Sequence, residues 1–523
     1  IYFAMWFSFI FTKSLPSCGT RLKITNEHQH LTQSSEYKGR WSFYLVLAGI
    51  VTTFGSSLPV GYNIGVVNTP AEVIKQFCNE SFISRYDVTL DEKWMNVLWS
   101  FVVSIFIVGG CTGSILGAYF ADNLGRKGAT ILTSVLWVIG ALLFLLCEKA
   151  NSVEMLVLGR LIVGLSGGLT TSIVPMYLTE LSPLALTGAM GVACPIGVNV
   201  GVLVGQVMGL NFLLGQPENW TYLLAFFSLL VIICFPVLCI LPESPKYLFV
   251  VKRDEETALR ELGRLRGVSA SVLAEDVAAL REEVPAGGAG GAARAGAGRW
   301  SMWRVLADPR LRLPLLLVCT MQAGQQTSGI NAVFYYSATI FKQAGLSDAQ
   351  AQYATIGCGF INVCTAVMMA KLLPSKGRRP LLLGSLLSAA VVLAALANMF
   401  SWMPYVCMVA VLTYVLVFGF GLGPIPYFIA SEMYEVGPRP AGMAWGSLAN
   451  WGGNFLVGMS FPTMRNIIGA YSFLVFSAIT AAVYVFQRIY LPETRGKTPT
   501  QVTQICSKGL RSRPRTSLDL NHA

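Results

Sequence analysis

Four amide side chains interrupt an apolar stretch that is long enough to cross a bilayer. The stretch runs from Pro314 to Phe341, and its amides are those of Gln322, Gln325, Gln326 and Asn331. On a helix the three glutamines share one face, because they are spaced i, i+3 and i+4. An amide buried in hydrocarbon without a partner costs a few kcal/mol, so this face needs a polar neighbour. Either the amides hydrogen-bond adjacent helices as a structural contact, or they bind a neutral solute that is rich in hydroxyl groups.

Further amides and aromatic rings lie in other apolar stretches. They are Asn362, Asn450, Trp451 and Asn454, and Tyr427 in the segment 421–428 with the sequence GLGPIPYF. Amides suit the hydroxyl groups of a pyranose, and aromatic faces suit its apolar C–H side. The Gly and Pro residues of the segment 421–428 break the helical hydrogen-bond ladder, which is tolerated at membrane depth only in packed protein or beside a cavity. We favour a hinge that moves when solute binds over a static kink.

Charged residues gather at the predicted cytoplasmic ends of the apolar stretches. They are Asp122, Arg126, Glu180, Glu243, Arg378, Arg379, Glu432 and Arg439. Residues of opposite sign at helix ends can form salt bridges that hold one conformation and break in another. The alternative is that the cations only anchor the chain at the bilayer surface. We favour a gate of salt bridges.

Arg160 is a charge inside an apolar stretch. A charge at membrane depth marks a functional or gating residue by default, and the alternative is a side chain that snorkels to the interface. No acidic residue accompanies Arg160 within the predicted spans. This argues against proton coupling, because proton relays normally use Asp, Glu or His inside the membrane.

The composition is that of an integral membrane protein. Of the 523 residues, 54% are hydrophobic and 12% are charged, which excludes a soluble globular domain. Hydropathy predicts twelve spans. They are 42–67, 95–120, 129–147, 155–177, 188–210, 221–241, 313–341, 351–373, 380–399, 404–431, 441–464 and 470–491.

The loops between the spans predict the orientation. Most Lys and Arg residues fall on the cytoplasmic side if both termini are cytoplasmic, so the net charge of +11 needs no nucleic acid partner. The three His residues lie near the termini and no Walker loop is present, so we expect neither a metal site nor a cofactor. Asn79 begins an Asn-Glu-Ser tripeptide in the first external loop, which predicts N-glycosylation.

The two halves of the chain repeat. GRK at 125 and GRR at 377, Glu180 and Glu432, and PESPK from Pro242 and PETRG from Pro492 recur at a spacing of roughly 250 residues. Such a repeat predicts an all-α membrane protein with twelve transmembrane helices in two pseudo-symmetric six-helix bundles. We expect a cytoplasmic N-terminal segment (1–41), an N-terminal bundle (42–241), a cytoplasmic linker (242–312), a C-terminal bundle (313–491) and a cytoplasmic tail (492–523). Within the linker, 254–283 reads as helical, and the Gly/Ala-rich part 285–299 as flexible.

These motifs resemble the facilitative hexose transporters, the GLUT-type sugar porters (solute carrier family 2) of the major facilitator superfamily. The resemblance covers about residues 40–500 and includes GRLIVGLSGG from Gly159, PMYLTELSP from Pro175, QQTSGINAVFYY from Gln325, GPIPYF from Gly423 and NWGGNF from Asn450. It implies facilitative uniport of a hexose such as glucose or fructose by alternating access, in the lipid bilayer of the plasma membrane. The sugar-binding amides that it implies are Gln325, Gln326, Asn331, Asn362 and Asn450, with Asn454 close by.

Some residues depart from the family pattern. Pro195 stands where many glucose carriers have a sugar-binding Gln, Tyr427 replaces a Trp, and Thr187 replaces an Arg of the gate. Asn63 stands where proton-coupled relatives have an Asp, which favours a uniporter. A proton-coupled sugar symporter and a sugar sensor that does not transport stay open as alternatives. An enzyme is not expected, because no nucleophile with a base, carboxylate pair or metal-ligand set converges in the spans.

Overall fold

A computed structural model describes residues 41–512 except 69, 90, 184, 211–212, 268–272, 283–299 and 400–403, and all regular structure in this part of the chain is helical. The N-terminal half comprises α3 (Phe43–Thr52), α4 (Leu58–Gly65), α5 (Ala71–Tyr86), α6 (Glu92–Cys147), α7 (Val153–Leu181), α8 (Thr187–Gly191), α9 (Ala193–Met208), α10 (Trp220–Ala225) and α11 (Phe227–Ile240). The C-terminal half comprises α15 (Arg312–Thr327), α16 (Ile330–Gln343), α17 (Asp348–Lys376), α18 (Arg378–Met399), α19 (Pro404–Gly419), α20 (Ile425–Met433), α21 (Arg439–Ile468) and α22 (Ser472–Tyr490).

Shorter helices lie in the segments that join and follow these halves. They are α12 (Glu255–Arg266), α13 (Ala274–Glu282), α14 (Met302–Ala307) and α23 (Pro499–Cys506). The single helical part predicted for 254–283 is therefore two helices, and Asp254 caps the first of them by accepting a hydrogen bond from the backbone of Thr257. The predicted flexible part, 285–299, and residues 1–40 of the predicted N-terminal segment lie outside the described residues.

Each of the twelve predicted spans coincides with helical structure. In the described part of the chain, eight helical segments are long and apolar enough to cross a membrane by length and composition. One of them, Val97–Cys147, covers two predicted spans. The span predicted at 313–341 is not among the eight, because the chain breaks at Ser328 and Gly329 into α15 and α16.

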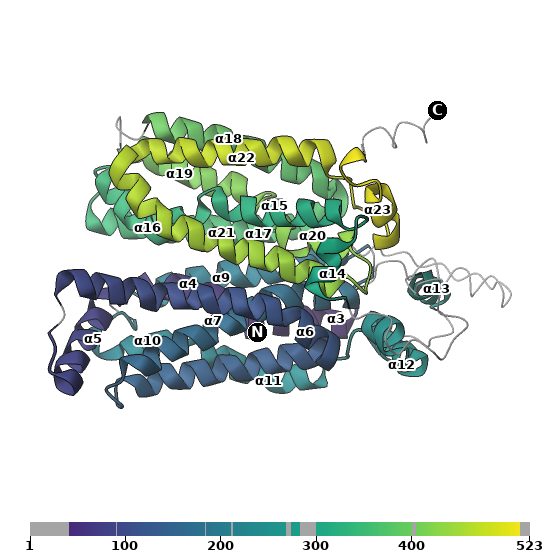
Figure 1. The fold of residues 1–523 in the computed structure, drawn as a ribbon, viewed down its shortest axis with the longest axis horizontal. Coiled ribbons are helices and arrows are strands. Elements are labelled where there is room, and N and C mark those ends of the chain that lie inside the picture. Colours follow the sequence, from purple (N-terminus) through teal and green to yellow (C-terminus); the bar gives the residue numbers. More distant parts are fainter. Residues whose placement is uncertain are drawn as a thin grey trace, which may run out of the picture.

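The two halves lie side by side as two groups of roughly parallel helices, blue and green to yellow in Figure 1, and α12, α13 and α23 gather at one end. Between the halves, α21 packs against α6 and α7, and α17 packs against α9. Small residues permit this close contact. At Gly110 of α6, a Cβ atom would lie 2.5 Å from the Trp451 ring of α21.

Two glycines at equivalent positions turn the chain between helices. Gly125 has φ +80° and divides α6, and Gly377 has φ +80° between α17 and α18. An L side chain rarely adopts this backbone conformation. A Cβ atom would also lie 2.2 Å from a carboxylate oxygen of Glu243 at the first turn and 2.6 Å from one of Glu493 at the second. The repeated Gly-Arg motif thus places a carboxylate directly against each turn.

Candidate functional site

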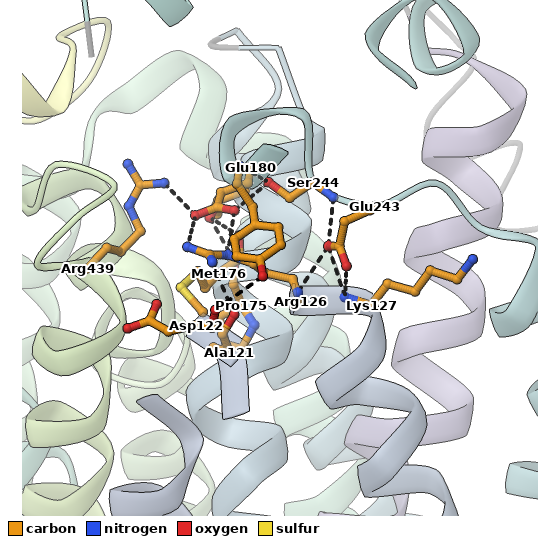
Figure 2. A network of polar contacts seen from close by, with 12 residues as sticks. Ala121, Asp122, Arg126, Lys127, Pro175, Met176, Glu180, Glu243, Ser244 and Arg439 are labelled. Carbon is orange, nitrogen blue, oxygen red and sulfur yellow. Dashed lines mark hydrogen bonds and ion pairs between the residues drawn. The ribbon is translucent and has the colours of Figure 1, made fainter. Parts of the chain in front are cut away.

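Glu180 is the centre of a buried ion cluster at the end of α7. Arg126 donates from Nε to Glu180 Oε2 at 2.9 Å, and both side chains have an exposed fraction of 0%. Ser244 Oγ donates to the same oxygen at 2.5 Å. Arg439 reaches from α21, in the other half, and donates from Nη1 to Glu180 Oε1 at 2.9 Å (Figure 2). We call these four residues the Glu180 cluster, and it joins the two halves of the molecule.

Glu243 holds the turn beside this cluster. Its carboxylate accepts hydrogen bonds from the backbone N–H groups of Arg126, Lys127 and Ser244 at 2.8 to 3.2 Å (Figure 2). Burial raises the pKa of Glu243 above its ordinary value, although these hydrogen bonds and the nearby Arg126 charge act in the opposite direction. Because its carboxylate accepts from the backbone N–H groups of Arg126 and Lys127, Glu243 caps the helix that follows Gly125.

The C-terminal half repeats this arrangement. Arg378 donates from Nη2 to Glu432 Oε1 at 2.8 Å, and Thr494 Oγ1 donates to Glu432 Oε2 at 2.6 Å. Glu493 accepts from the backbone N–H groups of Arg378 and Arg379 at 2.9 and 3.1 Å. Arg378, Glu432 and Thr494 form the Glu432 cluster, the counterpart of the Glu180 cluster.

The two clusters differ in their connection across the halves. Arg439 bridges to Glu180. The residue of the first half that is equivalent to Arg439 is Thr187. Thr187 lies in the wall of a cavity of about 110 Å³, together with Glu432 and Arg378. No ion pair from the N-terminal half to Glu432 occurs within the described residues. Among the described residues, Glu180 therefore pairs with an arginine from the opposite half, whereas Glu432 has no such ion pair.

Two other predicted gating residues lie beside the clusters. The backbone carbonyl of Asp122 accepts from the Tyr247 hydroxyl at 3.1 Å, and Arg379 Nη2 donates to the carbonyl of Arg488 at 2.8 Å. The structure thus places both residues at this end of the molecule. A gating ion pair for either remains a prediction.

Arg160 lies inside the N-terminal half and is 3% exposed. Its guanidinium donates to the carbonyl oxygens of Asn63 at 3.2 Å and Val102 at 3.4 Å, and it lies 4.6 Å from the centre of the Phe106 ring. These contacts direct the charge toward α4 and α6. The side chain is buried in the protein, and a role for Arg160 in gating remains a prediction.

The amides of α15 form a network with α20 and α21. Asn450 Nδ2 donates to Gln325 Oε1 at 2.6 Å and to Gln322 Oε1 at 2.9 Å. Gln326 Nε2 donates to Asn450 Oδ1 at 3.0 Å, and Asn331 donates to Gln326 Oε1. We call these five residues the amide network. Each amide oxygen of the three glutamines and Asn450 accepts a hydrogen bond from another member.

The network also compensates the break before α20. Gln325 Nε2 donates to the carbonyl oxygens of Leu422 at 3.0 Å and Gly423 at 2.6 Å. The residue four positions after Leu422 is Pro426, which has no N–H to offer, so the Leu422 carbonyl needs another donor. The structure confirms that the amides have polar neighbours on adjacent helices. Sugar binding by the same amides remains a prediction.

The other predicted sugar ligands lie around the contact between the halves. Trp451 is 2% exposed and donates from Nε1 to Thr171 Oγ1 at 3.2 Å. Tyr427 packs against apolar residues of the N-terminal half, and Asn362 and Asn454 are buried on α17 and α21. Asn79, the predicted glycosylation site, lies on α5, and its modification stays a prediction.

Several residues of the site were not predicted from the sequence. The hydroxyls of Ser244 and Thr494 complete the two clusters, and Glu493 caps the helix beside the second one. The repeat of PESPK and PETRG already aligned these positions. Ser114 and Ser447, which form a hydroxyl contact between the halves, had no comparable signal. Small hydroxyl residues are frequent in membrane helices, and only tertiary structure shows which of them meet.

Two equivalent helical halves, joined by a buried ion cluster at one end and carrying an amide network, define a membrane transporter of the major facilitator type. The family "Sugar (and other) transporter" matches residues 48–505. The facilitated glucose transporter member 3 of solute carrier family 2 is 39% identical in Bos taurus and 38% identical in Homo sapiens, over 88% of this chain and 92% of each relative. Member 5 from Equus caballus is 36% identical over 90% of this chain and 93% of its own.

Solved structures share the fold. The proton:xylose symporter XylE bound to 6-bromo-6-deoxy-D-glucose has a TM-score of 0.77 at 23% identity, over 88% of this chain and 98% of the symporter. The Escherichia coli fucose:proton symporter has a TM-score of 0.55 at 14% identity, over 87% of this chain and 98% of its own. The chain belongs to the sugar transporter family and, within it, to the facilitative hexose transporters of solute carrier family 2. It is a transporter and not an enzyme.

Proposed function

We propose that this protein is a uniporter for a hexose such as glucose or fructose in the plasma membrane, with both termini in the cytoplasm. The relatives named above are facilitated glucose transporters. The excess of Lys and Arg in the loops on the side of α12, α13 and α23 favours a cytoplasmic position for that side.

The observation that carries the proposal is the amide network. Its members are uncharged and buried; they belong to α15, α16 and α21 and lie against the start of α20. Neutral amides can donate to and accept from the hydroxyl groups of a sugar, whereas they offer no charge to select an ion. We assign sugar binding to Gln325, Gln326, Asn331, Asn362, Asn450 and Asn454, with Tyr427 and Trp451 as aromatic contacts.

The ion clusters supply the gate of this transporter. Arg439 connects the two halves through Glu180, so the pair must break before the cytoplasmic ends can separate. Loss of this contact on one side of the membrane, with closure on the other, is the alternating access of a rocking transporter.

Transport into proteoliposomes tests the proposal. We expect labelled glucose or fructose to equilibrate across the membrane, and a panel of unlabelled hexoses to compete for uptake and identify the preferred sugar. An alkaline interior should not make the sugar accumulate above equilibrium. Accumulation driven by the proton gradient would identify a symporter, and saturable binding without uptake would identify a sensor.

A further inference from the structure

Two buried amide oxygens lie where α9 of the N-terminal half meets α17 of the C-terminal half. Gln206 Oε1 and Asn362 Oδ1 are both buried, and neither has a hydrogen-bond partner among the described residues. Asn362 as a whole is 3% exposed. Gln206 was not predicted from the sequence, because one Gln near the end of an apolar helix carries no pattern.

The packing of Gly359 shows that Gln206 faces the opposite half. A Cβ atom at Gly359 would lie 2.7 Å from Gln206 Oε1 and 3.2 Å from Leu203 Cδ1. Asn362 follows Gly359 by three positions on α17, so the two residues share a helix face. The amides of Gln206 and Asn362 therefore lie on the same contact surface, within about one helical turn of each other.

These two acceptors contrast with the amide network. The oxygens of Gln325, Gln326 and Asn450 already accept hydrogen bonds from other amides, so a sugar that bonds there must replace existing partners. A buried acceptor without a partner is unfavourable, and buried polar groups in native proteins nearly always have one. Gln206 and Asn362 thus present acceptors for which the described residues supply no donor.

We propose that Gln206 is a further sugar-binding residue, and that Gln206 and Asn362 accept hydrogen bonds from hydroxyl groups of one hexose across the contact between α9 and α17. This inference rests on the proposed hexose transport. A hydroxyl group supplies the missing donor without introducing charge. Because the two amides belong to different halves, the bound sugar connects the halves at the contact that is remote from the Glu180 cluster, and its binding favours closure there.

Replacement of Gln206 by Met removes the acceptor and keeps an unbranched side chain of similar length. We expect hexose affinity in proteoliposomes to fall roughly three- to tenfold, which is the effect of one neutral hydrogen bond. The same measurement with each monodeoxyhexose identifies the hydroxyl involved. For the sugar that lacks this hydroxyl, Gln206→Met and the parental protein should bind with equal affinity, a result that altered helix packing alone does not produce.

Leu203→Met is the matched control, because Leu203 touches the same glycine without a polar group, and it should leave affinity unchanged. Gln206→Leu repeats the test if the Met variant is unstable. Unchanged affinity for every transported hexose in the Gln206 variants, or an equal loss for all deoxyhexoses, overturns the proposal. The parental protein is assayed first, so a failure of hexose transport itself is distinguished from a failure of the Gln206 assignment.

Discussion

Glu180 accepts hydrogen bonds from two guanidinium groups and one hydroxyl while fully buried. Removing two or more charges from water is costly, and only close mutual contact offsets that cost. The carboxylate of Glu180 is therefore the group that makes the burial of Arg126 and Arg439 tolerable. Its loss leaves two cations buried without their counter-ion.

Glu180→Gln should destabilise the folded protein by about 3–5 kcal/mol, the usual cost of breaking a buried ion pair from one side. Thermal unfolding of the purified protein in detergent measures this change. Glu154→Gln is the control in the same helix, because the Glu154–Arg85 pair is solvent-exposed, with side chains 56% and 36% accessible, and such pairs contribute little. Equal unfolding temperatures for Glu180→Gln and the parental protein would refute the central role of this carboxylate.

The sequence predicted the residues of the clusters better than their contacts. Arg126, Glu180, Arg378 and Glu432 were recognisable because the internal repeat presents each charge twice at equivalent span ends. The amides of α15 were recognisable because they interrupt an apolar stretch. Their partners, such as the carbonyl oxygen of Leu422, were not, because a backbone acceptor leaves no signal in residue types and depends on where α20 begins.

Each predicted apolar span coincides with helical structure, and eight segments of the described chain are long and apolar enough to cross a membrane. The breaks inside the spans were only partly predictable. The break between α19 and α20 follows from Gly and Pro in the segment 421–428. The π-helical turn at Thr53–Ser57 between α3 and α4 contains Gly55 and lies just before Pro59, yet it was not predicted. It also lies against α9 and α11, so both local sequence and tertiary packing favour a break there.

The difference between the two clusters yields a prediction for the short helix α8. Thr187→Arg should add an ion pair from the N-terminal half to Glu432, because both residues line the same cavity and Arg439 makes the equivalent contact with Glu180. A second pair across the halves stabilises the form in which this end is closed, so we expect slower exchange of labelled hexose across proteoliposomes and a higher unfolding temperature.

Thr187→Gln is the control for side-chain size at this position, since a neutral amide of comparable reach lacks the charge. It should transport at nearly the parental rate. High salt should weaken the effect of Thr187→Arg only slightly if the new pair is buried, because buried pairs are screened much less than exposed ones. Parental exchange rates in Thr187→Arg would show that the missing arginine does not limit the cycle.

The two halves of the molecule are also joined by hydroxyl groups within the helices. Ser447 of α21 lies 2.8 Å from Ser114 of α6 and 2.7 Å from Thr171 of α7, measured between side-chain oxygens. Trp451, one turn further along α21, donates to the same Thr171. In sequence, Ser447 lies between Arg439 of the Glu180 cluster and Asn450 of the amide network, so these contacts must separate when the end with the Glu180 cluster opens.

Ser447→Ala should shift the protein toward the form that is open at this end. It removes both hydroxyl contacts of Ser447, yet Ser114 and Thr171 each keep a hydrogen bond to a carbonyl of their own helix, Gly110 and Gly168. The variant therefore leaves no buried hydroxyl without a partner, and we expect normal folding. Ser447 has one hydroxyl proton, so it donates to only one of Ser114 and Thr171 while both bond their own carbonyls. The net loss is one hydrogen bond of about 0.5 kcal/mol or more, which corresponds to a shift of at least roughly twofold in the ratio of open to closed forms.

Spin labels on opposite halves measure that ratio through their distance distribution. Leu124, beside the Gly125 turn that divides α6, and Lys376, at the end of α17, are both exposed near the clusters. Replacing the exposed Cys239 and Cys364 by Ser reduces unwanted labelling. The long-distance population should grow in Ser447→Ala and stay constant in Thr112→Val, which removes an exposed hydroxyl that bonds the carbonyl of Val108 within α6. An unchanged distribution in Ser447→Ala would mean that the hydroxyl contacts form and break without energetic consequence, leaving the Glu180 cluster as the element that holds this end closed.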